Sequence, residues 1–249
     1  MLAAHMATLV NAMKSSFHAP PPANDPPLFT AILKKSCEDF QVEEQIGIDF
    51  SGAGEHLYLQ IEKRRLNSMD IVELLQSVYK VRSVDIGLSG LKDRNSVSSQ
   101  WFSVRTPQDA SAAEHAFEKF NRASDSSNAG DISDSAGRLR LLRAERHQRK
   151  LRRGTHISNG FSIRLHNVQC SDITSTVDAV LQRIQSIKDQ GFPNYIGAQR
   201  FGQDQRNVER VQRWIASPKT RVSRQKRSLW LSVARSIIFN EVVAARVVD

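Results

Sequence analysis

Between residues 56 and 78 the spacing of apolar side chains changes from every second residue to every third or fourth, which limits the chain to folds that mix strands and helices. The first run predicts a strand with Leu57, Leu59 and Ile61 facing a core, and the outward positions are His56, Tyr58, Gln60 and Glu62. Asn67 or Ser68 then caps a helix with apolar residues at i, i+3, i+4 and i+7, namely Ile71, Leu74, Leu75 and Val78. A loop and a second alternating run, Trp101 to Arg105, follow. Strands, helix, loop and strand in this order predict an α+β fold rather than repeated βαβ units.

Weaker patterns fill in the rest of the chain. Short strands are expected at 29–33 and 40–44, and helices at 109–120, 173–191, 208–215 and 226–248. Residues 121–137 are rich in Ser, Asp, Asn and Gly and predict a mobile surface loop. The helix at 226–248 is apolar on more than one face, so we expect it to be buried between partners.

The chain is strongly basic, with 35 Lys and Arg against 26 Asp and Glu and an isoelectric point near 9.9. This balance favours a polyanionic partner, either a nucleic acid or an acidic membrane surface. We expect no membrane-spanning stretch. Cys37 and Cys170 are the only cysteines, so neither a disulfide framework nor a zinc site is indicated, and a reducing cytoplasm is expected.

Residues 1–28 hold five of the eight prolines and predict a disordered or polyproline-like tail. Their apolar run, residues 2–13, lacks the positive start of a signal peptide and the arginines of a transit peptide. Folded structure is therefore expected from Phe29 onward.

The loop that precedes the second alternating run carries a candidate nucleophile. Asp93 stands between Lys92 and Arg94, and these cations are expected to keep its carboxylate ionised at neutral pH. An ordinary turn in which Asp93 or Asn95 bonds its own backbone explains the same residues.

The segment GLKDRNSVSSQWFSV, residues 90–104, resembles the signature of the TruD family of tRNA pseudouridine synthases. The resemblance implies that Asp93 is the catalytic nucleophile. LKKSCEDFQVEE, residues 33–44, and GAGEHLYLQIEKRRLNSMD, residues 52–70, are similar to two further family segments. They imply that Phe40 lines a uridine pocket and that Lys34 lies near the RNA backbone, while Lys92 and Arg94 hold the carboxylate or a phosphate. Without the resemblance, Phe40 is an inward strand aromatic.

Eight cations and one acid lie between Arg138 and Arg153, a density that favours phosphate contact over a solvated face. RHQRKLRRG, residues 146–154, resembles a family segment and implies RNA contact by Arg146, Lys150 and Arg152. SNGFSI, residues 158–163, resembles another, in which Asn159 reads the uracil edge and Phe161 stacks on it. Ser158 replaces the usual glycine and would be strained at a positive φ. A core position on a strand is the alternative for Phe161.

FPNYIGAQRFG, residues 192–202, is very similar to the motif that opens the family's insertion domain. It implies tRNA contacts by Tyr195 and Arg200, with an aromatic turn packing two domains as the alternative. The resemblance extends over residues 29–249. It implies a pseudouridine-synthase-type mixed, mainly antiparallel sheet flanked by helices in an incomplete catalytic domain, 29–192, followed by the start of a helical insertion domain, 193–249.

The implied activity is isomerisation of uridine to pseudouridine at position 13 of tRNA, with an extruded base and with neither metal nor cofactor. The expected partner is tRNA rather than a membrane, and a monomer is expected. An inactive RNA-binding fragment and a chain that cannot fold alone are the alternatives, since the family's return to the catalytic sheet lies beyond residue 249.

Overall fold

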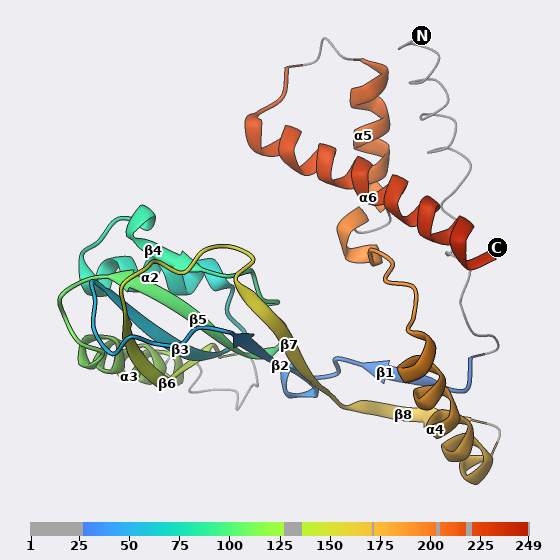
Figure 1. Cartoon of the computed structure of the whole chain (residues 1–249), viewed down its shortest axis with the longest axis horizontal. Helices are drawn as coiled ribbons and strands as arrows, with labels where there is room; N and C mark the ends of the chain where they lie inside the picture. The colour runs from blue at the N-terminus through green and yellow to red at the C-terminus, as the bar shows by residue number, and fades with distance from the viewer. Residues whose placement is uncertain (1–26, 127–135, 171, 203–204, 218–220, 249) are drawn as a thin grey trace. The chain divides into compact units, whose positions relative to one another are not determined.

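The computed structural model describes residues 27–126, 136–170, 172–202, 205–217 and 221–248 (Figure 1). These residues form two compact units, Thr30–Gln169 and a C-terminal unit that starts at Cys170. The predicted tail lies outside the described residues as far as residue 26. The long helix after residue 172 groups with the C-terminal unit, whereas the sequence suggested a boundary near residue 192.

The first unit is built on a six-stranded sheet. Its strand order is β6 (Arg138–His147), β3 (His56–Arg64), β5 (Val97–Arg105), β2 (Phe40–Ile46) and β7 (His156–Ile163), with the short β4 (Ile86–Leu88) also pairing with β5. The β2 and β5 pair is parallel, and every other pair in this sheet is antiparallel. This is the mixed, mainly antiparallel α+β architecture that the sequence predicted.

Two helices, α2 (Ser68–Tyr79) and α3 (Ser111–Ser126), supply the helical side of the main core. The capping pattern at the start of α2 is present, because the Asp70 carboxylate accepts the backbone N–H of Asn67 at 2.7 Å. The inward residues of β3 are buried as predicted. The core contains Leu57, Leu59, Ile61, Ile71, Val72, Leu75, Tyr79, Phe102, Val104 and Phe117.

The opposite face of β3 is also buried at one end, which corrects the expected outward positions of His56 and Tyr58. His56 is 5% exposed and Tyr58 1% exposed. Tyr58 packs with Trp101 and Leu151, and the end of β2 and the chain after it add Ile46, Ile48 and Phe50 to this cluster. Simple alternation failed because it assumes that one sheet face meets water, whereas here the chain after β2 covers part of that face.

Helix α3 continues to Ser126, so residues 121–126 of the predicted loop are helical. Residues 127–135 lie outside the described part, and the basic stretch begins on β6 at Arg138. A separate two-stranded ribbon pairs β1 (Thr30–Leu33) with β8 (Leu165–Gln169) in antiparallel register. Short 3-10 turns, η1 (Cys37–Asp39) and η2 (Ser83–Asp85), precede β2 and β4.

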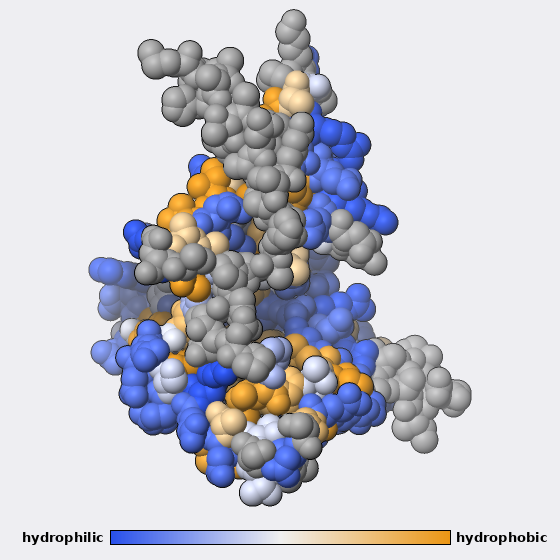
Figure 2. Space-filling model, turned by 90° about the vertical axis from the view of Figure 1, so that its right-hand side faces the viewer, coloured by the Kyte–Doolittle hydropathy of each residue, from blue (hydrophilic) through white to orange (hydrophobic). Residues whose placement is uncertain are grey.

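The C-terminal unit contains α4 (Ile173–Gln190), η3 (Ala198–Phe201), α5 (Arg206–Ala216) and α6 (Arg224–Val248). All three helices were predicted. Helices α5 and α6 share a small core with η3, formed by Phe201, Val208, Val211, Val233 and Ile237. Other apolar side chains of α4 and α6 remain at the surface, and orange patches are visible among blue ones in Figure 2.

Helix α6 is less buried than its composition suggested. Over Lys226–Val247 it is long and apolar enough to cross a membrane, and 17% of that stretch is buried. The expectation that no stretch approaches the length of a membrane span is therefore wrong by length and composition. A single helix of this kind is weak evidence for a membrane, because helices of water-soluble proteins pass the same test.

Candidate active site

The loop between β4 and β5 holds Asp93 in a fixed backbone position. Lys63, which is fully buried at the end of β3, donates from Nζ to the carbonyl oxygens of Leu66 at 2.7 Å and Asp93 at 2.8 Å. The hydroxyl of Ser96 donates to the same Asp93 oxygen at 2.7 Å. Two donors on one carbonyl leave the loop little freedom at this residue.

The Asp93 carboxylate makes an ion pair with Lys34, whose Nζ lies 2.6 Å from Oδ2. The side chains of Lys34 and Asp93 are 28% and 32% exposed, so the pair is open to an incoming ligand. The family resemblance implies that Lys34 lies near an RNA backbone, and this contact stays a prediction. The structure places it directly on the candidate nucleophile.

Neither cation beside Asp93 in the chain makes that ion pair within the described residues. Lys92 Nζ lies 2.5 Å from Oε2 of Glu44, and Arg94 donates from Nε to the carbonyl of Arg65 at 3.3 Å. These partners contradict the prediction that Lys92 and Arg94 hold the carboxylate, and the alternative, contact with a phosphate, stays a prediction. The side chains of Lys92 and Arg94 point away from the Asp93 carboxylate, to Glu44 and Arg65. Lys34, 59 residues away in the chain, is the residue that reaches it.

The Lys92 and Glu44 side chains are 8% and 0% exposed, and the second carboxylate oxygen of Glu44 also has a partner. Glu44 Oε1 accepts the backbone N–H of Trp101 at 3.1 Å. The backbone N–H of Lys92 donates to Ser68 Oγ at 2.9 Å, and that hydroxyl donates to Gln100 at 2.7 Å. This network joins the Asp93 loop to β2, β5 and the start of α2.

Two aromatic rings continue the cluster away from Asp93. Lys34 Nζ lies 3.8 Å from the centroid of the Phe40 ring, and the Phe40 and Phe161 centroids are 5.9 Å apart at an angle of 55°. The antiparallel register pairs Val42 with Phe161, which puts Phe161 diagonally across from Phe40 on one face of the sheet. Phe161 is 60% exposed, so the alternative of a core position does not hold for it.

The backbone of Lys34 has a φ of 56°, in the left-handed region that few residues other than glycine adopt. Such a conformation costs about 1–3 kcal/mol and persists where the surroundings hold it in place. Here the side chain gains contacts with Asp93 and Phe40. The strained backbone at Lys34 is consistent with a residue whose side chain serves the candidate active site rather than the stability of the loop.

Asn159 lies opposite Glu44 in the β2 and β7 register, on the same face as Phe161. Its Oδ1 is buried and has no hydrogen-bond partner among the described residues. An unpaired buried acceptor is unfavourable unless a ligand satisfies it. Ser158 does not have a positive φ, and its hydroxyl donates to Gln45 at 2.7 Å, so the strain expected at this serine is absent.

The electrostatic feature that sequence reasoning missed is Lys63. Burial lowers the pKa of its ammonium to about 8, although the nearby Asp93 charge acts in the opposite direction. Its oxygen partners are carbonyls rather than carboxylates. The sequence did contain a signal for this buried lysine, because Lys63 continues the inward positions Leu57, Leu59 and Ile61. A lysine on the inward face of a strand needs hydrogen-bond acceptors inside the protein.

The residues of the basic segment are less uniform than their charge suggested. Arg146 donates to the carbonyls of Thr106 at 2.5 Å, Pro107 at 3.2 Å and Gln108, and Lys150 donates to the carbonyl of Val84 at 2.6 Å. Arg152 is exposed. Contact with RNA stays a prediction for Arg146, Lys150 and Arg152. Arg146 and Lys150 already donate hydrogen bonds to backbone carbonyls of neighbouring loops.

The last two predicted contacts belong to the C-terminal unit. Tyr195 is half-buried and Arg200 is exposed in η3. The backbone of Ile196 next to Tyr195 is held by Asn240 of α6, which accepts from its N–H at 2.8 Å and donates to its carbonyl at 3.0 Å. The motif thus packs against α6 within its own unit, and its contact with tRNA stays a prediction.

Comparison with known proteins identifies the family of this chain. The family model for tRNA pseudouridine synthase D (TruD) matches residues 23–223. The chain belongs to the TruD family. Asp93, Lys34, Phe40, Asn159 and Phe161 all lie within the matched region.

Individual relatives support the TruD assignment. The chain is 43% identical over 229 residues to tRNA pseudouridine synthase D of Pseudomonas putida strain W619, covering 92% of this chain and 59% of the relative. It is 42% identical over 210 residues to the protein of that name from Cellvibrio japonicus, covering 84% and 57%. The chain therefore spans somewhat more than half the length of these TruD relatives.

A solved structure shares the fold. The crystal structure of the putative TruD protein from Methanosarcina mazei aligns with a TM-score of 0.56 at 21% identity, covering 89% of this chain and 49% of that one. At this identity the likeness supports the TruD fold alone.

Proposed function

We propose that this chain carries the catalytic centre of a tRNA pseudouridine synthase, with Asp93 as the nucleophile. The observation that supports the proposal most directly is the contiguous row of Asp93, Lys34, Phe40 and Phe161, in which a carboxylate, a cation and two rings follow one another at contact distance. A carboxylate beside aromatic rings suits a reaction on an extruded base.

The reaction is an isomerisation, so no co-reactant is consumed. Asp93 provides the covalent partner that allows the bond between N1 and C1′ of uridine to break. The uracil turns and forms a bond from C5 to C1′, and the covalent bond to Asp93 breaks, which restores the free carboxylate. The hydrogen on C5 leaves to solvent, and N1 gains one, so the atoms balance. Lys34, 2.6 Å from the carboxylate, orients the nucleophile and stabilises its charge before the base arrives.

The neighbouring residues position the base. Phe161, being 60% exposed, offers a ring face on which uracil can stack. Asn159 presents Oδ1, which has no hydrogen-bond partner among the described residues, as an acceptor for the uracil N3–H. Extruding the target base from the RNA costs a few kcal/mol, which these contacts offset.

The RNA is proposed to be tRNA, with uridine 13 as the target. The basic character of the chain, +9 at neutral pH, supports a polyanionic substrate. The names of the TruD relatives support tRNA as its class. The position of the target nucleotide comes from the family resemblance.

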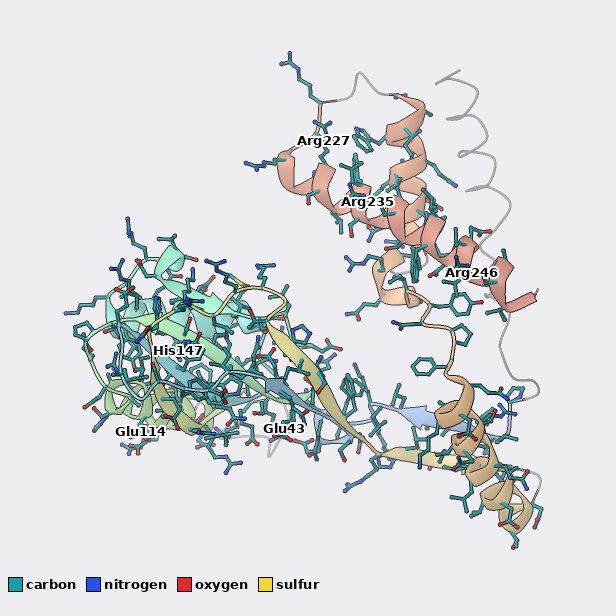
Figure 3. All side chains as sticks on the ribbon, in the orientation of Figure 1. Glu43, Glu114, His147, Arg227, Arg235 and Arg246 are labelled. Carbon is teal, nitrogen blue, oxygen red and sulfur yellow. The ribbon has the colours of Figure 1, made fainter. Side chains whose placement is uncertain are left out.

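The test is release of tritium from tRNA that carries 5-tritiated uridine. Wild type is expected to release one equivalent, and Asp93→Ala none, while both bind tRNA with similar affinity. The matched control is Glu43→Gln, which removes an exposed carboxylate on β2 (Figure 3). Replacing uridine 13 by cytidine should abolish release. Activity retained by Asp93→Ala would overturn the assignment.

A second candidate function is RNA binding without catalysis. It is favoured by the position of β7 at the end of the strand order, where Phe161 is 60% and Ile163 49% exposed. A reacting base needs shelter from water, and these residues do not provide it on that side. Tight binding of tRNA with no tritium release from wild type would establish this alternative.

A further inference from the structure

Two tryptophans meet where α5 and α6 pack together in the C-terminal unit. The ring centroids of Trp214, near the end of α5, and Trp230, in α6, lie 5.6 Å apart at an angle of 51°. They line a hollow of about 390 Å³. Its other lining residues are Arg210, Arg213, Ala216 and Ser217. We call this site the tryptophan hollow.

The rings are held firmly but are not sealed in. Both are half-buried, and Trp230 packs on the small core that joins α5 to α6 through Val208, Val211 and Val233. Aromatic rings fixed at a surface in this way provide a stacking platform at low entropic cost. The same platform is accessible from solvent, since Arg210 and Arg213 at its edge are exposed.

Among the described residues, the charged side chains that line the hollow are those of Arg210 and Arg213. Arg210 makes a long bond of 3.5 Å to Asn207. Arg213 donates from Nε to the carbonyl of Glu209 at 3.4 Å and makes an exposed ion pair of 3.8 Å with the carboxylate of that residue, an interaction worth little in water. Residues 205–227 contain eight Lys and Arg and a single acid. Both guanidinium groups can therefore turn to an external anion.

We propose that the tryptophan hollow binds an unpaired nucleotide of an RNA. The base stacks on a tryptophan ring, and Arg210 and Arg213 contact the flanking phosphates. Stacking tolerates any base, so the site supplies affinity without reading sequence. The identification of the RNA as a tRNA rests on the function proposed above. The proposal that the hollow binds an RNA nucleotide rests on its own aromatic and cationic side chains.

The first experiment follows tryptophan fluorescence of the full 249-residue chain as a short single-stranded RNA is added. A base stacked on Trp214 or Trp230 should quench their emission. Trp101, 4% exposed in the other unit, gives a background that a stacking base does not reach. Trp230→Leu should remove most of the quenching and weaken binding roughly 5- to 150-fold, the range for loss of one stacked base.

The second experiment avoids the tryptophan packing. The double variant Arg210→Ala with Arg213→Ala should weaken binding and lower the slope of log affinity against log salt by about 1.4, as expected for two lost phosphate contacts to a single strand. Arg235→Ala is the control, because this exposed arginine of α6 does not line the hollow (Figure 3). A second double variant, Arg235→Ala with Arg246→Ala, removes two arginines outside the hollow. The proposal would be overturned if both double variants weakened RNA binding equally.

Failure here and failure of the proposed function give different results. Asp93→Ala should lose tritium release and keep the fluorescence quenching. The double arginine variant should keep kcat and raise KM. RNA binding without quenching would overturn the tryptophan hollow and leave the synthase assignment untouched. Quenching by vesicles of phosphatidylserine but not by RNA would also overturn it, and would assign this surface to an anionic membrane.

Discussion

Lys34 donates from Nζ to Oδ2 of Asp93 over 2.6 Å, although 59 residues separate them in the chain. The contact joins the turn before β2 to the loop before β5. It gives the candidate nucleophile a cationic partner that neither of its neighbours in sequence supplies.

Lys34→Ala should lower kcat for pseudouridine formation about 100- to 1,000-fold, the usual cost of removing one donor from a reacting charge. Binding of tRNA should change little, because one surface cation contributes a small part of the affinity. Lys34→Arg should recover part of the rate. Lys35→Ala is the matched control, since it removes an exposed neighbour of equal charge. Similar rates for the two alanine variants would contradict the role given to Lys34.

Lys92→Met should destabilise the protein by about 3–5 kcal/mol, because it leaves the Glu44 carboxylate buried without a cation. Adding Glu44→Gln should restore part of the loss, since the amide is neutral and its oxygen can still accept from Trp101. Urea unfolding followed by circular dichroism measures both. A double variant less stable than Lys92→Met would show that the pair is not the cause.

The charge on Lys63 should make stability rise with pH. Burial lowers its folded pKa to about 8, so between pH 8 and the unfolded value of 10.5 the unfolded chain holds more of this proton than the folded one. Its unfavourable contribution, constant below pH 8, should shrink by up to about 3 kcal/mol across that window. The unfolding free energy of wild type minus that of Lys63→Met isolates this group. A difference that does not change from pH 7.5 to 10 would contradict the assignment.

Asn159→Ala should reduce kcat/KM about tenfold, the equivalent of one lost hydrogen bond of 1.4 kcal/mol to the uracil edge. Stability should hardly change, because Oδ1 has no internal bond to lose within the described residues. Steady-state tritium release measures kcat/KM, and thermal unfolding measures the stability. A large loss of stability with unchanged kcat/KM would make Asn159 a structural residue instead.

Local sequence predicted the elements well. The period of two at 56–62 and the period near 3.6 at 71–78 gave β3 and α2, and Asn67 with Asp70 marked the start of the helix. These signals are readable because they depend on neighbours within one turn or one strand. The prediction that 121–126 is loop failed where α3 continued through polar residues. The apolar periodicity of residues 109–120 is too weak to locate the C-terminal end of α3.

The sequence by itself determined the α+β class, most element positions, the basic character and, through family resemblance, the candidate residue Asp93. The tertiary structure alone decided that Lys34 rather than Lys92 reaches that carboxylate, that Lys92 turns to Glu44, and that Tyr58 is covered. The physical reason is that a charged side chain pairs with whatever strand register and loop closure bring within a few ångströms, and distance along the chain does not reveal that.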